Sequence, residues 1–329
     1  MKCTNQLKKY ILLLFASLLT TVIFTGCGSS SSDNGKEKIL FIMTDTEDTF
    51  RSLLSEGVLT AANDSGVSIE KIETGKNVEA QLNLVKTAKE KGYTAIILQP
   101  ADAEAALQMQ VASNDIPIVY VNAKPSDSVL EANKYIYVGS KEEQAGQYQA
   151  EYVLEKLQKP KSLRLIILEG AKGHSGTIGR TSAVKNYFKD QGVEANIVFA
   201  DICNWSDTEA MKKLDVFFRT NQEFDAVFCN NDTMALGACE ALKKHGVSLD
   251  IIPVCGVDAT ADGCASIKAG DMQFTVLQDA KSQGLAAVQA AKELSNGKDI
   301  SGIENAADDE KAIWIPFQKV DASNVSQFQ

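Results

Sequence analysis

Polar and aromatic side chains are concentrated in short segments that follow apolar runs of the sequence. Asp, Asn, Gln and Arg groups can form paired hydrogen bonds with hydroxyl groups, and an aromatic ring can cover a face of C–H groups. A neutral polyol presents both kinds of surface, so these residue types suit a binding site for a small hydroxylated molecule. The segments are residues 44–51, 99–102, 170–180, 204–207, 230–232, 257–258 and 278–279.

The sequence lacks the motifs of the common catalytic sites. Residues 173–176 read Gly-His-Ser-Gly, without the glycine two residues after the serine that a nucleophile elbow requires. The glycines of residues 170–179 form neither a dinucleotide fingerprint nor a phosphate-binding loop. His174 and His245 stand far apart without a metal-ligand spacing, and His174 is expected to be a polar loop residue. We therefore expect a binding protein rather than an enzyme, with no cofactor or metal.

Apolar runs of strand length alternate with amphipathic stretches of helical length. The expected strands are residues 38–43, 67–73, 95–98, 118–121, 135–138, 164–168, 195–200, 226–229, 252–256 and 274–277. The expected helices are residues 50–65, 78–91, 103–113, 142–157, 179–191, 207–220, 233–245, 261–269 and 280–295. Short apolar strands between helices are typical of parallel sheets that are covered on both faces. We therefore predict an α/β fold of two doubly wound lobes, with ligands beyond the carboxyl ends of the strands.

Some residues in the polar segments also have a structural interpretation. In the expected helix 233–245, apolar side chains recur at three- and four-residue spacing, which places them on one face. Asp232 is positioned to cap the first turn of this helix and Gly246 to end it, so Asp232 is expected to be a cap rather than a ligand contact. Trp314, in the late apolar run 312–317, is expected in the core.

The amino terminus has the pattern of an export signal. Lys2, Lys8 and Lys9 precede an apolar run over residues 10–24, which is shorter than the roughly 20 residues of a spanning helix. The run leads into Gly26-Cys27, which resembles a bacterial lipobox, where the cysteine is acylated and the chain is cut before it. We expect a lipoprotein signal peptide at residues 1–26 and a flexible, serine-rich tether at residues 27–36. An ordinary signal peptide with an incidental cysteine is the alternative.

The composition of the mature chain limits its partners. Removal of the leader leaves 30 Lys and Arg against 43 Asp and Glu, a formal charge of −13. Because nucleic acids and anionic surfaces are bound through clustered cations, neither is expected as a partner. About 300 residues with 44% apolar content favour two cores over one. Cys229 and Cys255 lie in apolar strand-like runs and are expected to be small buried side chains. The five cysteines Cys203, Cys229, Cys239, Cys255 and Cys264 include no CxxC pair, so a disulfide among them is left open but is not indicated.

Ordered motifs along the chain resemble those of the type 1 periplasmic sugar-binding proteins, the group that includes the ribose and galactose receptors. The longest is AVFCNNDTMALGA at residues 226–238, followed by Gly-Val-Asp at 256–258 and TVLQ at 275–278. QPAD at 99–102 and IPIV at 116–119 resemble the corresponding turns of the first lobe. The likeness covers nearly all of the chain after Lys36. It implies a monomeric receptor whose two lobes close on a sugar by hinge motion.

The resemblance assigns ligand contacts to both predicted lobes. The implied contacts are Asp48, Phe50, Arg51, Asp102, Asn122, Arg180, Trp205, Asn231, Asp258 and Gln278. Asn122 and Gln278 are placed at the hinge and the cleft, and Trp205 is placed as an aromatic platform. Core packing of Trp205 and a surface ion pair between Glu47 and Arg51, four residues apart, are the structural alternatives.

The first turn departs from the pattern of the ribose receptors. Those receptors have Asn, Pro and two Phe where this chain has Asp48, Thr49, Phe50 and Arg51. The arginine is more similar to that of galactofuranose-type receptors. The resemblance therefore leaves pentose, hexose and furanose open as ligands, and Arg51 makes a sugar acid worth testing.

The resemblance also implies a domain organisation and a set of partners. The first lobe is expected at residues 37–122 plus 279–309 and the second at 123–278 plus 310–329. Three hinge crossings are expected, near Asn122, near Gln278 and near residues 308–311. The expected role is a receptor, lipid-anchored through Cys27, that delivers a monosaccharide to an ABC importer. A sensor that presents sugar to a membrane histidine kinase or chemoreceptor is the alternative, whereas a DNA-binding regulator is excluded because a signal peptide precedes the first strand.

Overall fold

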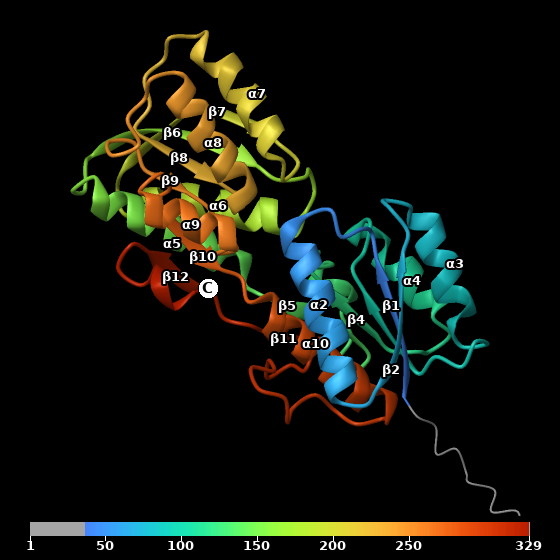
Figure 1. The fold of residues 1–329 in the computed structure, drawn as a ribbon. Coiled ribbons are helices and arrows are strands. Elements are labelled where there is room, and N and C mark those ends of the chain that lie inside the picture. Colours follow the sequence, from blue (N-terminus) through green and yellow to red (C-terminus); the bar gives the residue numbers. More distant parts are fainter. Residues whose placement is uncertain (1–36, 329) are drawn as a thin grey trace, which may run out of the picture. The chain divides into compact units, whose positions relative to one another are not determined.

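The computed structural model describes residues 37–328, which contain two six-stranded sheets (Figure 1). The predicted signal peptide at 1–26 and the predicted tether at 27–36 lie outside these residues. A compact unit begins at Glu37. Within the described part of the chain, no helix is both long enough and apolar enough to cross a membrane.

The first sheet is entirely parallel. Its strand order is β11-β5-β4-β3-β1-β2, and every neighbouring pair runs in the same direction. The strands are β1 (Lys38–Met43), β2 (Ser68–Glu73), β3 (Ala95–Leu98), β4 (Ile118–Val121), β5 (Tyr135–Gly139) and β11 (Ala312–Trp314). All residues of β3, β4 and β5 are buried, as expected for strands that helices cover on both faces.

The second sheet is parallel except at one edge. Its order is β12-β10-β9-β8-β6-β7, and β12 runs antiparallel to β10. The strands are β6 (Ser162–Glu169), β7 (Glu194–Ile202), β8 (Ala226–Cys229), β9 (Val254–Cys255), β10 (Phe274–Leu277) and β12 (Gln318–Asp321). The two sheets confirm the predicted pair of α/β lobes.

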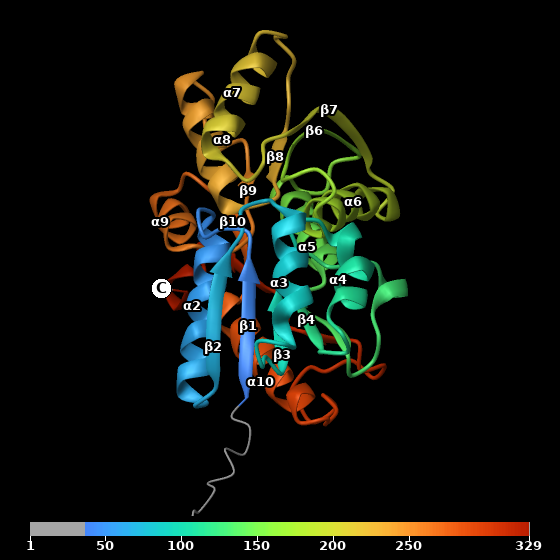
Figure 2. The ribbon, with the colours of Figure 1, turned by 90° about the vertical axis from the view of Figure 1, so that its right-hand side faces the viewer.

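Helices cover both faces of each sheet (Figures 1 and 2). In the first lobe, α2 and α10 pack on one face, and α3 and α4 pack on the other. In the second lobe, α7, α8 and α9 pack on one face, and α5 and α6 on the other. The helices are α2 (Thr49–Asp64), α3 (Val78–Ala88), α4 (Ala106–Ala112), α5 (Glu142–Lys156), α6 (Ser175–Asp190), α7 (Asp207–Phe218), α8 (Asp232–Lys244), α9 (Ala261–Ala269) and α10 (Ala280–Ser295). Short 3₁₀ turns lie at Ala103–Ala105, Asp127–Val129 and Val325–Gln327.

The chain crosses between the lobes three times, at residues 140–141, 278–279 and 315–317. The first and third crossings differ from the positions expected near Asn122 and near residues 308–311. Because β5 pairs with β4 and β11 pairs with β5, residues 123–139 and 310–314 belong to the first lobe rather than the second. The hydrophobic pattern identifies a buried strand, but it does not identify the sheet that the strand joins.

Helices α5 and α6 approach each other closely at two glycines. A Cβ atom on Gly146 would lie 2.1 Å from the carbonyl oxygen of Arg180, and one on Gly179 would lie 2.6 Å from the Cβ of Glu142. Only glycine permits these contacts without displacement of a neighbour. The close packing brings the side chains of Glu142 and Arg180 together beside the first crossing.

Candidate functional site

A pocket opens between the carboxyl ends of the two sheets. Its lining residues come from both lobes and from the second crossing. They are Asp48, Phe50, Arg51, Asn122, His174, Arg180, Trp205, Asn231, Asp258 and Gln278. The space free of atoms around these side chains is ≈ 310 Å³, with open solvent at the mouth included. Side chains from both lobes thus face one small, partly open space.

Nine of the ten predicted contacts line this pocket, and Asp102 does not. Asp102 is exposed, and its carboxylate accepts a hydrogen bond from the backbone N–H of Glu104 at the start of a 3₁₀ turn. A helix-capping role explains the acidic residue at this position. Contact with a ligand stays a prediction for the other nine.

His174 is the lining residue that sequence reasoning missed. It caps α6, and its Nδ1 accepts a hydrogen bond from the backbone N–H of Gly176 at 3.1 Å. The proton of the neutral ring therefore sits on Nε2, which lies 3.5 Å from Asn122 Oδ1 in the other lobe. Burial, with the charges of Arg180 and Arg51, lowers the pKa of His174 to about 3. The only available signal was its place in the loop after β6, because histidine is an uncommon helix cap.

The start of α2 supplies three lining residues from the first lobe. Asp48 is the N-cap, and its Oδ1 accepts the backbone N–H of Arg51 at 3.0 Å. Phe50 follows as a buried ring. The guanidinium of Arg51 donates to Asp45 Oδ1 at 2.6 Å, so its partner is Asp45 and not Glu47.

Trp205 forms an aromatic wall of the pocket and is partly buried against the core of the second lobe. The ring of His174 meets the indole edge to face, with centroids 5.1 Å apart. Gly170 makes room for the indole, because a Cβ atom there would lie 2.1 Å from the indole carbon Cη2. The indole is therefore held by contacts with Gly170, His174 and the core, and its role as a stacking platform stays a prediction.

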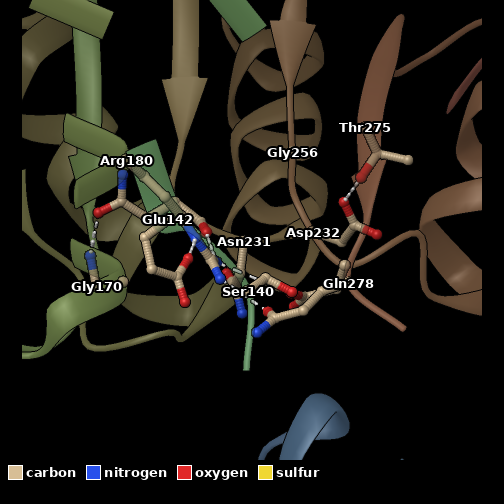
Figure 3. Close-up of polar contacts among 12 residues, drawn as sticks. Ser140, Glu142, Gly170, Arg180, Asn231, Asp232, Gly256, Thr275 and Gln278 are labelled. Carbon is tan, nitrogen blue, oxygen red and sulfur yellow. Dashed lines mark hydrogen bonds and ion pairs between the residues drawn. The ribbon is translucent and has the colours of Figure 1, made fainter. Parts of the chain in front are cut away.

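Arg180 is the centre of a buried polar network (Figure 3). Its Nε donates to Glu142 Oε2 at 2.7 Å and its Nη2 to Gln278 Oε1 at 2.8 Å. A third hydrogen bond runs from Nη1 to the carbonyl oxygen of Asn230. Both side chains of the Arg180–Glu142 ion pair are about 95% buried, with exposures of 5% and 6%. Despite this burial, the neighbouring carboxylates of Glu142 and Asp258 raise the pKa of Arg180.

Three lining residues keep a buried polar atom that has no hydrogen-bond partner among residues 37–328. These atoms are Arg51 Nε, Asp258 Oδ1 and Gln278 Nε2. Buried polar groups are nearly always paired, so such atoms are candidates for bonds to a ligand. Two of them are donors and one is an acceptor, and a hydroxyl group can satisfy either kind.

Asp258 carries a buried carboxyl group on a strained backbone. Its Oδ1 lies 3.9 Å from Arg180 Nη1, beyond hydrogen-bonding distance. Burial raises the pKa of Asp258 well above its usual range; the charge of Arg180 opposes this shift, and the carboxylates of Asp232, Asp48 and Glu142 add to it. Its backbone is also strained, with a φ of 121°, a value that non-glycine residues rarely adopt.

Left-handed backbone recurs at two other lining residues, Asn122 with a φ of 63° and Trp205 with a φ of 67°. Strain of this kind persists only where the surrounding structure imposes it, and it clusters at ligand sites. Its presence at three lining residues from both lobes supports a functional interpretation of the pocket.

Asn231, rather than Asp232, is the N-cap of α8, and its Oδ1 accepts the backbone N–H of Met234 at 3.0 Å. Asp232 is the first residue of the helix and is completely buried. Its carboxylate accepts hydrogen bonds from Thr260 and Thr275, the latter shown in Figure 3. The prediction that Asp232 caps α8 was therefore wrong, because the cap is Asn231, one residue earlier. Asp232 has a structural role of another kind, since its carboxylate bonds to Thr260 and Thr275.

The chemistry of these residues suits binding. No cluster of three or more His, Cys, Asp or Glu side chains with the geometry of a metal site occurs among the described residues. The five described cysteines are free and buried, which confirms the burial expected for Cys229 and Cys255 and answers the question of pairing that the sequence left open. The pocket combines hydrogen-bonding atoms of both kinds with two aromatic rings, Phe50 and Trp205, which matches the two surfaces of a polyol.

Comparisons with known proteins agree with the fold. The family model described as periplasmic binding protein domain matches residues 39–299. A Rhizobium meliloti protein with the provisional name of rhizopine-binding protein is 32% identical over 287 residues, which cover 86% of this chain and 89% of that protein. The D-galactose/methyl-galactoside binding periplasmic protein of Haemophilus influenzae is 27% identical, over 95% of this chain and 98% of its own length.

A solved structure extends the agreement to three dimensions. The ABC transporter solute binding protein from Bacillus halodurans with bound myo-inositol is 28% identical and superposes with a TM-score of 0.78. The match covers 91% of this chain and 99% of the other. The chain belongs to the type 1 periplasmic sugar-binding protein family.

Proposed function

We propose that the chain is an extracytoplasmic receptor that binds a monosaccharide or a cyclic polyol between its lobes and delivers it to an ABC importer. The single observation that carries this proposal is the set of unpartnered buried atoms Arg51 Nε, Asp258 Oδ1 and Gln278 Nε2 around the Trp205 indole. A ring of hydroxyl groups satisfies both donors and the acceptor, while its C–H face covers the indole.

Closure of the lobes is the proposed signal to the importer. Arg51 lies in the first lobe, Asp258 in the second and Gln278 at a crossing, so a ligand bonded to all three stabilises the closed arrangement over an open one. A ligand can shift this equilibrium only by its difference in affinity for the two states, and contact with both lobes provides that difference.

The ligand class follows from the pocket and its relatives. Relatives are named for galactose and ribose, and the 28% identical solved structure contains myo-inositol. All are compact, uncharged and rich in hydroxyl groups, in agreement with a lining that carries unpartnered donors, an unpartnered acceptor and two aromatic rings. We infer that the chain binds such a ligand without transforming it, and product analysis after long incubation with each bound sugar checks this inference.

A thermal-shift panel tests the function. The panel contains myo-inositol, D-galactose, D-ribose, D-allose and L-arabinose. A ligand at about 100 times its dissociation constant stabilises the native state by about 2.7 kcal/mol, which raises the melting temperature by roughly 5–10 °C. Trp205→Ala serves as the binding-deficient control and is expected to lose the shift. Absence of any shift across the panel would refute the proposed ligand class.

Lipid attachment at Cys27 is the proposed means of retention at the membrane. It rests on the basic and apolar leader that ends in Gly26-Cys27. In an expressing bacterium, the wild type is expected in the membrane fraction, with a diacylated amino-terminal peptide by mass spectrometry. Cys27→Ser is expected to lose the lipid and leave the membrane fraction, and an unmodified Cys27 in the wild type would contradict the proposal.

A further inference from the structure

The charge of Arg51 is compensated before any ligand arrives. Its Nη2 lies 2.6 Å from Asp45 Oδ1, and the two side chains are only 15% and 21% exposed. Asp45 itself does not line the pocket. The positive charge of Arg51 is therefore balanced by a carboxylate that does not line the pocket. Its Nε remains a buried donor without a partner among the described residues.

The other two basic side chains of the lining also carry no uncompensated positive charge. Arg180 is paired with Glu142 at 2.7 Å. His174 is neutral, because burial lowers its pKa to about 3. Asp48 adds an acidic side chain to the lining from the first lobe. Of the three basic side chains in the lining, two are paired with carboxylates and the third is neutral.

A carboxylate on the ligand would therefore lose its hydration without gaining an unpaired cation. Burial of a charge without a partner is strongly unfavourable, whereas a hydroxyl group can use the same donors at much smaller cost. Like charges across a binding surface also act against the wrong ligand. The pocket is built to reject acids.

We propose that Asp45 determines the charge specificity of the pocket: by pairing with Arg51 it restricts the site to uncharged polyols, and its removal admits sugar acids. This inference rests on the proposed function, and it narrows the ligand class left open by the sequence. Asp45 acts through Arg51, so it is a positioning residue rather than a ligand contact.

Asp45→Asn is a conservative way to test the proposal. The carboxylate Oδ1 also accepts the backbone N–H of Glu47 at 3.1 Å, and the amide oxygen of asparagine keeps this bond. The substitution removes one negative charge and leaves the shape of the turn. Glu47→Gln is the matched control, because Glu47 is exposed in the same turn and loses the same charge.

The experiment is calorimetric titration with two matched pairs, D-galactose with D-galacturonate and D-glucose with D-glucuronate. Wild type and Glu47→Gln are expected to show no uronate binding. Asp45→Asn is expected to bind at least one uronate with an affinity about 10- to 100-fold above the wild-type limit. The double variant Asp45→Asn/Arg51→Gln is expected to lose the gain in uronate affinity, because the gain depends on the unpaired guanidinium of Arg51.

Each outcome decides the proposal. Uronate binding by the wild type, or no gain in uronate affinity in Asp45→Asn, overturns the proposal. An equal gain in uronate affinity in Glu47→Gln also overturns the proposal, because the gain would then be a general effect of charge. If Asp45→Asn fails to fold, Asp45→Ser, whose hydroxyl can accept the same backbone N–H, is titrated instead. If the wild type binds neither D-galactose nor D-glucose, those two sugars are excluded as ligands. The uronate affinity of Asp45→Asn still decides the proposal in that case, because it is compared with the uronate limit of the wild type and not with the neutral sugars.

Discussion

Asp258→Asn is expected to weaken ligand binding and to stabilise the ligand-free protein. Asp258 Oδ1 is buried and has no hydrogen-bond partner among the described residues, and burial raises the pKa of this carboxyl. The ligand-free fold therefore bears the cost of a desolvated acidic group that only a ligand satisfies. Binding sites commonly retain such locally unfavourable groups for function.

The magnitude follows from the contacts of Asp258. Loss of one partner of a buried hydrogen bond costs about 1–3 kcal/mol, so the substitution is expected to reduce affinity about 5- to 150-fold. Arg180 keeps Glu142, Gln278 and the carbonyl oxygen of Asn230 as partners, so the substitution leaves no orphaned cation. Removal of the buried carboxyl is expected to add about 1–2 kcal/mol of stability, a rise of roughly 2–8 °C in melting temperature.

Calorimetric titration and thermal unfolding without ligand provide the two measurements. Asp250→Asn is the matched control, because Asp250 is exposed in the same lobe and loses the same charge. Asparagine tolerates the left-handed backbone at 258, so the variant introduces no new strain. Unchanged affinity, or a ligand-free variant less stable than the wild type at neutral pH, would refute the reasoning.

Gly170→Ala is expected to displace the Trp205 indole by more than about 1 Å and to reduce ligand affinity about tenfold or more, because the new Cβ would lie 2.1 Å from the ring. Gly302→Ala is the control, because a Cβ atom there meets nothing within 4 Å. Equal titration curves for the two variants would contradict the steric argument. Trp205→Ala is expected to reduce affinity about 10- to 150-fold, whereas Trp314→Ala, in the half-buried ring that packs on Tyr137, is expected to lower the melting temperature and leave affinity within about threefold. Burial raises the pKa of Asp232 to about 7, so the stability that this group contributes is present below its unfolded pKa of about 4 and is lost as the pH rises through 7. The ligand-free protein is therefore expected to have a lower melting temperature at about pH 8 than at about pH 5.5. A higher melting temperature at about pH 8 would contradict the assignment.

The sequence predicted most elements because their signals are local. The bounds of α9, α10, β1, β3, β4, β8 and β10 agree residue for residue with the expected ranges. Each of these strands is a short apolar run, and α9 ends at Gly270 in the left-handed conformation that favours glycine. Periodicity and end signals of this kind require no knowledge of the partner elements.

The remaining elements depend on tertiary contacts. Helix α6 begins at Ser175, four residues before the expected start, because Gly176 and Gly179 disguise its first turn as a loop. Strands β11 and β12 were not among the expected strands. Residues Gln318–Asp321 of β12 are mostly polar and join the sheet as an antiparallel edge. Edge strands carry little hydrophobic pattern, so their pairing appears only in the assembled sheet.

The candidate site was predicted as a set of positions but not as a network. Position after a strand placed Asp48, Trp205 and Asp258 correctly at the carboxyl ends of the sheets. The pairing of Arg51 with Asp45 instead of Glu47 was not foreseen, because helical spacing favoured the residue four positions away. Side-chain direction at a helix start depends on the cap geometry, which the sequence does not specify.

A crystal structure with the polyol that gives the largest thermal shift would locate the bound ligand in the protein. We predict ligand density between the lobes, with one hydroxyl group within hydrogen-bonding distance of Asp258 Oδ1, others near Arg51 Nε and Gln278 Nε2, and the C–H face of the ring against Trp205. Density at any other place, or a ligand that leaves these three atoms unpartnered, would contradict the account.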